Sequence, residues 1–182
     1  KIVLPKSLLT ISNNAFLKCT NLETVEFAEG SMLQTIGDYA FQYCFSLKTI
    51  HIPEGVTTIG KYAFDGCNSL SEITLSEGLT TLDDYAFRGT KSLQTINLPD
   101  SLTYLGTYLF QYGGLTEIVI PKNITMLGKP GSSGFSTSTT GYMFNECVDL
   151  KKVTLPEGLT GIGTSAFNGC INLTTVNIPD TV

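Results

Sequence analysis

Five cysteines are the residues of this chain best suited to chemistry, and all five occupy one position of a regular spacing. Metal-binding thiols usually come as Cys-x2-Cys pairs or with histidine partners, whereas these cysteines are widely and almost evenly spaced along the chain. Disulfides between stacked turns would be within reach, but the number of cysteines is odd. We therefore expect free, buried thiols that pack as small hydrophobic side chains: Cys19, Cys44, Cys67, Cys147 and Cys170.

The single histidine, His51, is the only other candidate for acid–base or nucleophilic chemistry. A triad would need a Ser or Cys nucleophile beside it and an acid to orient it. The cysteines occupy a different position of the repeat, and we expect Glu26 and Thr74 to flank His51 in neighbouring turns. The sequence therefore predicts no enzyme, no cofactor and no metal centre.

Two further rows of like residues have more than one interpretation. Tyrosines recur two residues before a repeated Phe and could form an exposed strip for a sugar or a peptide; we favour rings that pack on one another. Carboxylates recur at one turn and could attract Ca²⁺, but each turn supplies only one, so a solvated surface is the preferred interpretation. The rows are Tyr39, Tyr62, Tyr85, Tyr108 and Tyr142, and Glu29, Glu54, Glu77, Asp100, Glu157 and Asp180, with Lys122 interrupting the second.

The composition excludes several classes of protein. The 182 residues are 42% hydrophobic and 15% charged, with a net charge of −5. Disordered chains combine low hydrophobicity with high charge, and nucleic-acid binders carry basic patches, neither of which is present. No apolar run approaches the ~18 residues of a membrane span. The beginning at Lys1 shows no signal peptide and resembles the middle of an array, so we expect a fragment of a longer protein.

The elements that position these residues come from one internal repeat. It is marked by seven phenylalanines at a nearly constant interval, with one long gap before Phe144: Phe16, Phe41, Phe64, Phe87, Phe110, Phe144 and Phe167. An alternating segment such as Ile50-x-Ile52 predicts a short strand, and Pro-Glu-Gly after it predicts a turn. A second apolar clasp, Val56-x-x-Ile59, precedes a glycine that is expected to be left-handed or tightly packed. Ala-Phe-x-x-Cys then predicts a short 3₁₀ or α-helical turn.

A unit of about 23 residues buries too little apolar surface to fold alone, so the repeats must stack. We expect one solenoid over residues 1–182, with seven repeats and the start of an eighth, interrupted by a Ser/Thr/Gly-rich insertion at 129–140. Its fold class is an α/β repeat solenoid, a right-handed superhelix with a parallel concave sheet. The Cys position holds Thr90 in the fourth repeat and Gly113 or Gly114 in the fifth, so the least regular geometry is expected there.

The repeat resembles a known family. Leu47-x-x-Ile50-x-Ile52-Pro53-x-x-Val56 resembles a leucine-rich repeat, and the Ile-Gly-x-x-Ala-Phe-x-x-Cys continuation is similar to the BspA type. The resemblance implies a secreted or cell-surface protein, mostly bacterial, that adheres to host proteins or other cells and carries no catalytic motif.

The outward strand positions vary while the inward ones do not, which is typical of a scaffold that presents a binding surface. The candidate partner-binding residues on the concave face are Glu26, His51, Thr74, Asn97, Val119 and Thr154, and the candidate loop residues are Ser133, Phe135 and Ser136. The expected partner is an extracellular protein, a host or other-cell surface component or a glycan. A purely structural stalk and a carbohydrate-binding accessory domain remain the alternatives.

Overall fold

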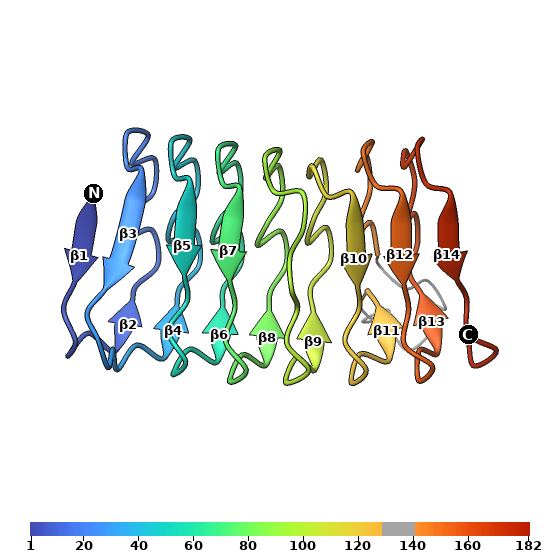
Figure 1. Ribbon diagram of the computed structural model, residues 1–182, viewed down its shortest axis with the longest axis horizontal. Coiled ribbons are helices and arrows are strands. Elements are labelled where there is room, and N and C mark those ends of the chain that lie inside the picture. Colours follow the sequence, from blue (N-terminus) through green and yellow to red (C-terminus); the bar gives the residue numbers. More distant parts are fainter. Residues whose placement is uncertain (129–140) are drawn as a thin grey trace, which may run out of the picture.

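A computed structural model describes residues 1–128 and 141–182. The candidate loop residues Ser133, Phe135 and Ser136 lie outside this described part. The chain winds as a single row of coils from its N-terminus to its C-terminus (Figure 1). All strand pairs are parallel, as expected for coils that repeat in the same direction. None of the described residues forms a helix that could span a bilayer.

The first row of strands is formed by the alternating segments that the sequence predicts. Its strands are β1 (Ile2–Leu4), β3 (Thr24–Phe27), β5 (Thr49–His51), β7 (Glu72–Thr74), β10 (Glu117–Val119), β12 (Lys152–Thr154) and β14 (Thr175–Asn177). They form two sheets, in the orders β1-β3-β5-β7 and β10-β12-β14. In register, Ile50 lies opposite Val25 and Ile73, which confirms the column of inward aliphatic side chains.

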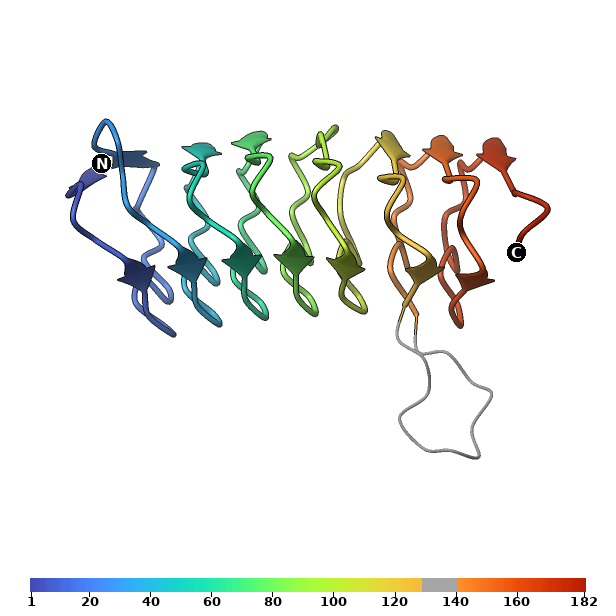
Figure 2. The ribbon, with the colours of Figure 1, turned by 90° about the horizontal axis from the view of Figure 1, so that it is seen from below.

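A second row of two-residue strands lies on another side of the stack (Figure 2). It consists of β2 (Thr10–Ile11), β4 (Thr35–Ile36), β6 (Thr58–Ile59), β8 (Thr81–Leu82), β9 (Tyr104–Leu105), β11 (Met126–Leu127) and β13 (Gly161–Ile162). These residues belong to the predicted apolar clasp, and the sequence analysis missed their strand pairing. A Thr at the first position and a buried Ile at the second, as in β6, give the alternation of a half-buried strand.

The predicted helical turns are wrong, because no helix is present in the described residues. In each coil, the segment from the Tyr position to the Cys position of the repeat, such as Tyr62–Cys67, forms what we call the arc. Alternate backbone amides of the arc donate to different partners. The amides of Ala63, Asp65 and Cys67 bond to carbonyls three residues earlier, whereas those of Tyr62, Phe64 and Gly66 bond to the next coil at 2.8–3.0 Å. In an α-helix, backbone amides point along the helix axis and bond to carbonyls of the same helix. Here half of them point along the stack, so the arc is a run of tight turns.

The core is a column of aromatic rings enclosed by aliphatic side chains. Five phenylalanines, from Phe41 to Phe144, are fully buried. Neighbouring Phe rings stack with centroids 5.1–5.8 Å apart and planes within 11° of each other. Burial of a Phe side chain contributes about 1.5–3 kcal/mol. Since each ring is covered by the coils on both sides, this stabilisation exists only in the stack.

Left-handed backbone recurs at the column tyrosines, and also two residues after the column Phe, as at Gly66 and Gly89, rather than at the glycines where it was expected. The five column tyrosines all have left-handed φ values, from 55° to 61°, a region that bulky residues rarely adopt. Five glycines follow the apolar clasp and were expected to bend or pack tightly: Gly37, Gly60, Gly106, Gly128 and Gly163. Only Gly128 has positive φ. The others pack closely, since a Cβ on Gly60 would lie 2.8 Å from the Asp38 amide nitrogen.

The middle of the array is irregular, as the substitutions at the Cys position predict. No strand forms between β7 and β10 in the first row, and Figure 1 shows a coil there without an arrow. The cause lies in the cysteine column. The thiols of Cys44, Cys67 and Cys147 donate to the Phe carbonyl of the preceding coil at 2.9–3.2 Å. The Thr90 hydroxyl donates instead to Phe87 of its own coil, at 2.8 Å, and therefore makes no tie to the preceding coil.

Candidate binding surface

The predicted partner-binding residues share one side of the stack, which we call the strand face. Glu26, His51, Thr74 and Asn97 are exposed and Thr154 is half-buried. Val119 is 63% exposed. Register places His51 opposite Thr74 and Val119 opposite Thr154. The first row of strands therefore holds five of the six residues on this side. Asn97 lies in no strand but lines a hollow with Val119 and Thr154. Binding through these residues stays a prediction.

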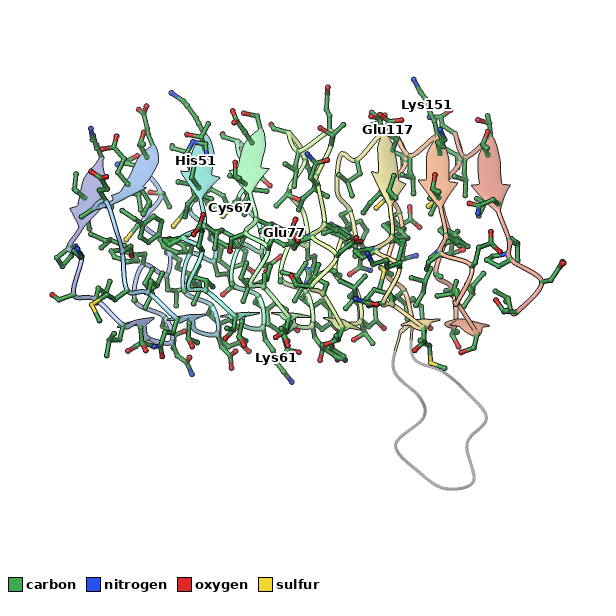
Figure 3. The ribbon with its side chains drawn as sticks, turned by 60° about the horizontal axis from the view of Figure 1, so that its bottom comes forward. His51, Lys61, Cys67, Glu77, Glu117 and Lys151 are labelled. Carbon is green, nitrogen blue, oxygen red and sulfur yellow. The ribbon has the colours of Figure 1, made fainter. Side chains whose placement is uncertain are left out.

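His51 lies in the N-terminal half of the strand face and has no catalytic surroundings. Its Nδ1 lies 2.9 Å from Thr74 Oγ1, and Glu26 pairs with Lys1 at 2.7 Å. Figure 3 shows His51 on β5, away from the interior where Cys67 lies. Glu26, the acid expected beside His51, is thus paired with Lys1, and the arrangement is suited to recognition by hydrogen bonding.

The first hollow of the strand face has a volume of about 600 Å³. It is lined by residues 25–28, Gly30 and Ser31 of one coil and by residues 51–54 of the next. The chain between Val25 and Ile36 is two residues longer than that between Ile50 and Ile59. This extra length accounts for the recess, and its exposed Glu26 and Glu54 give it an acidic rim.

The second hollow lies in the C-terminal half and has a volume of about 470 Å³. It spans three coils and is lined by polar residues that include Asn97, Glu117, Lys152 and Thr154, together with Val119 and Leu155. Lys122 borders it and pairs with Asp100 at 2.7 Å. This hydrogen-bonded pair lowers the pKa of Asp100 and raises that of Lys122. Lys122 thus interrupts the carboxylate row by neutralising one of its members.

The carboxylate row offers no metal site in the part of the chain that the structure describes. No group of three His, Cys, Asp or Glu side chains there is arranged to hold an ion. Glu54, Glu77 and Glu157 are exposed, in agreement with a solvated surface. Their separation follows from the repeat, which places one carboxylate in each coil.

The tyrosines stack on one another, as the favoured interpretation predicts. Neighbouring ring centroids are 4.4–5.0 Å apart and the planes differ by 3–6°. All five residues are half-buried, and burial raises the pKa of Tyr85 to about 12. Because the ring faces cover each other, only edges and hydroxyl groups remain for solvent. A sugar would need an open ring face to stack on.

The cysteines have structural surroundings, with one exception. Cys44, Cys67 and Cys147 are buried and Cys170 is partly buried, whereas Cys19 in the first coil is exposed. Burial raises the pKa of Cys44 to about 11 and that of Cys147 to about 12. The expectation that all five are buried is therefore wrong for Cys19, which has no coil of this chain before it.

A buried polar row beside the phenylalanines was missed by the sequence analysis. Asp65 is buried, accepts a hydrogen bond from Gln42 Nε2 at 2.8 Å and lies 3.8 Å from Arg88 Nε. Asp84 is also buried and accepts from the Thr107 amide and hydroxyl at 2.9 and 3.1 Å. The signal was available, since Gln42, Asp65 and Arg88 each follow a column Phe. These contacts join neighbouring coils and serve the scaffold.

Comparison with solved structures shows the same architecture in bacterial proteins. A leucine-rich repeat protein of T. pallidum superposes with a TM-score of 0.81 at 24% identity, over 95% of this chain and 77% of that one. The pneumococcal vaccine antigen PcpA gives 0.67 at 26% identity, over 99% and 51%. A leucine-rich repeat protein of Bacteroides ovatus gives 0.57 at 28% identity, over 97% and 60%. The chain thus spans about half to three quarters of these structures.

The sequence comparisons agree with the structural ones. No curated protein matches the chain significantly. The family profile described as the BspA type leucine rich repeat region matches residues 1–112, 34–140 and 137–182, in six copies. Repeats of this kind are protein-interaction modules, and the match indicates no catalytic family. Together, the profile match, the parallel coils and the Phe and Cys columns show that the chain belongs to the BspA-type leucine-rich repeat family.

Proposed function

We propose that this chain is a non-enzymatic adhesion module of a secreted or cell-surface protein, and that it binds an extracellular protein through the strand face. The family supports the interaction role. A surface location is supported by the solved relatives, one of which is a leucine rich cell surface protein of Faecalibacterium prausnitzii that shares the fold at 23% identity.

The observation that carries the proposal is the contrast between the two sides of the first-row strands. Inward positions are uniform and buried, as at Val25, Ile50 and Ile73. Outward positions differ from coil to coil and are exposed, as at Glu26 and Thr74. Stability requires only the inward residues, so the diversity outside them fits the recognition of a specific partner.

The mechanism is the presentation of side chains at fixed intervals. Parallel strands hold successive outward residues about 4.8 Å apart, and the rigid stack removes the entropic cost of arranging them. The two hollows provide recesses of about 600 and 470 Å³ for side chains of the partner. Seven strands at this spacing are long enough to support an interface of standard size, about 800 Å² per partner.

The alternatives receive less support. A purely structural stalk would not need two recesses bordered by exposed polar residues on one face. A carbohydrate module would use the tyrosine column, but its ring faces are stacked at 4.4–5.0 Å and covered. Asn123 and Asn172 stand in Asn-x-Thr glycosylation sequons. Their side-chain amides are not free, because both donate to a neighbouring coil, at 2.7 and 2.8 Å.

Binding of the chain to an array of immobilised extracellular-matrix and serum proteins tests the proposal. We expect at least one partner with micromolar affinity, and a loss of about tenfold or more when Glu26, His51, Thr74 and Asn97 are changed to alanine. The melting temperature should remain unchanged, because all four are exposed.

A matched control carries four exposed alanine substitutions on or directly after the arc, at Lys18, Thr20, Asn68 and Lys91. It should bind as the unmodified chain does. Equal losses in both variants would contradict recognition by the strand face. Absence of any binding at tens of micromolar would favour the stalk, and loss of a glycan-array signal on Tyr62→Ala and Tyr85→Ala would favour the carbohydrate module.

A further inference from the structure

The strand face contains a break in its hydrogen-bond ladder, which we call the seam. It lies along residues 95–98, which pair neither with β7 of the preceding coil nor with β10 of the following one. No backbone N–H or C=O of Thr95, Ile96, Asn97 or Leu98 forms a hydrogen bond within the described residues. Equivalent residues such as Ile50 pair with the coils on both sides. Unpaired backbone groups are rare in folded proteins, so the seam needs a physical explanation.

The seam is closed at both of its ends. At one end, the Thr116 amide donates to the Gln94 carbonyl at 2.9 Å. At the other, Lys122 pairs with Asp100 at 2.7 Å, and Asn123 Nδ2 donates to the Asp100 carbonyl, also at 2.7 Å. These contacts hold the coil to the following one. Towards the preceding coil, Ser92 Oγ donates to the Asn68 carbonyl and Ser101 Oγ to the Leu79 carbonyl, both at 2.7 Å. The break is a local opening rather than a frayed end.

The sequence explains why the opening occurs at this coil. Thr90 and Gly113 replace the cysteines that elsewhere donate to the preceding coil, so two successive ties are missing. The interval from Ile96 to Ile118 is also one residue shorter than the interval from Ile73 to Ile96. The shorter interval accounts for the lost pairing with the following coil, and the missing thiol tie at Thr90 accounts for the lost pairing with the preceding one, where the interval is regular.

The surroundings of the seam fit a ligand of defined chemistry. The 470 Å³ hollow lies over it and is lined by all four unpaired residues. Val119, 63% exposed, provides an apolar contact in this hollow. Glu117 and Lys152 lie opposite each other in register, and neither side chain forms an ion pair among the described residues. One free charge of each sign therefore borders an apolar patch and a set of unpaired backbone groups.

We propose that the seam binds an extended peptide segment of the protein partner, in which an apolar residue is flanked by an acidic and a basic one. The apolar side chain covers Val119, the acidic one pairs with Lys152 and the basic one with Glu117. Polar groups of the segment hydrogen-bond with unpaired N–H and C=O groups of residues 95–98, which line the hollow. This inference rests on the proposed function and assigns its central contact.

Selection of a phage-displayed random peptide library on the intact chain tests the inference. We expect enriched peptides to carry the acidic–apolar–basic pattern. As synthetic peptides, they should slow hydrogen exchange of the Thr95–Leu98 amides. Lys152→Glu should weaken them about tenfold, because attraction becomes repulsion. Lys151→Glu, the same charge change on an exposed neighbour that does not line the hollow, should change their affinity less than twofold. Val119→Lys should abolish binding and leave the melting temperature unchanged.

Two results would overturn the seam as a peptide site. One is the recovery of peptides that bind equally well to the Lys152→Glu and Val119→Lys variants. The other is the recovery of no peptide at all. If the chain still binds a folded protein through Glu26, His51 and Thr74 in either case, the proposed function stands and only the seam is excluded.

Discussion

Burial of the cysteine column predicts a two-class reaction with thiol reagents at pH 8. With a pKa of about 11, about one Cys44 side chain in a thousand is a thiolate at this pH. With a pKa of about 12, the fraction for Cys147 is about one in ten thousand. An exposed thiol with the ordinary pKa of about 8.5 is roughly one-quarter ionised at this pH. Since the thiolate is the reactive form, buried members should react at least about a hundred times more slowly, before steric protection is counted.

Alkylation with iodoacetamide, followed over time and mapped by mass spectrometry, measures these rates at each position. Cys19 should be modified within minutes in the native protein, because it is exposed. The buried Cys44, Cys67 and Cys147 should follow only after denaturation, when all five become equivalent. Modification of Cys67 or Cys147 in native buffer at the rate of Cys19 would refute the argument, because both side chains are fully covered in this stack.

Other perturbations probe the scaffold. Phe87→Ala removes a ring stacked on both sides and should lower the free energy of unfolding by about 3–5 kcal/mol, measured by urea denaturation; Phe16→Ala, at a half-buried ring stacked on one side, should cost less. Burial raises the pKa of Asp65 above its ordinary value of 3.8. The carboxyl therefore lowers the free energy of unfolding as pH rises from 3.8 through the raised value. Asp65→Asn should stabilise the protein at pH 7, but not below pH 3.8. Absorbance titration at 295 nm should show Tyr85 ionising near pH 12, and unfolding should accompany it. Thr90→Cys should restore a tie to the preceding coil, raise the melting temperature by a few degrees and slow exchange at the seam.

Much of the fold could be predicted because the repeat fixes local conformation and packing together. The alternation around Ile50 and the terminating Pro53 defined a strand, and its recurrence at a constant period required parallel stacking. Position in the repeat also predicted the stacked tyrosines and the irregular middle, since the same side chain must meet its own copy in the next coil. These inferences needed no long-range information beyond the period.

Features that depend on the direction of individual amides could not be predicted in this way. A segment such as Tyr62–Cys67 has the length and composition of a short helix. Whether its amides point within the coil or along the stack is decided by the neighbouring coil, whose carbonyls accept them at 2.8–3.0 Å. For the same reason, the left-handed backbone of Tyr62 was not foreseeable, because the cost of its φ of 55° is offset by contacts that only the stack supplies.

The candidate surface shows the limit of periodic reasoning, since its recesses arise where the period fails. Two extra residues after Val25 produce one hollow, and the coil shortened by one residue before Ile118 produces the other. Perfect coils would present a uniform ladder with every backbone group paired, which leaves a ligand only side-chain tips to contact. A departure in length or in the cysteine tie costs the scaffold some pairing, and the unpaired backbone groups are those that the proposed peptide would contact. In this solenoid, the least regular coils are therefore the most informative place to look for specificity.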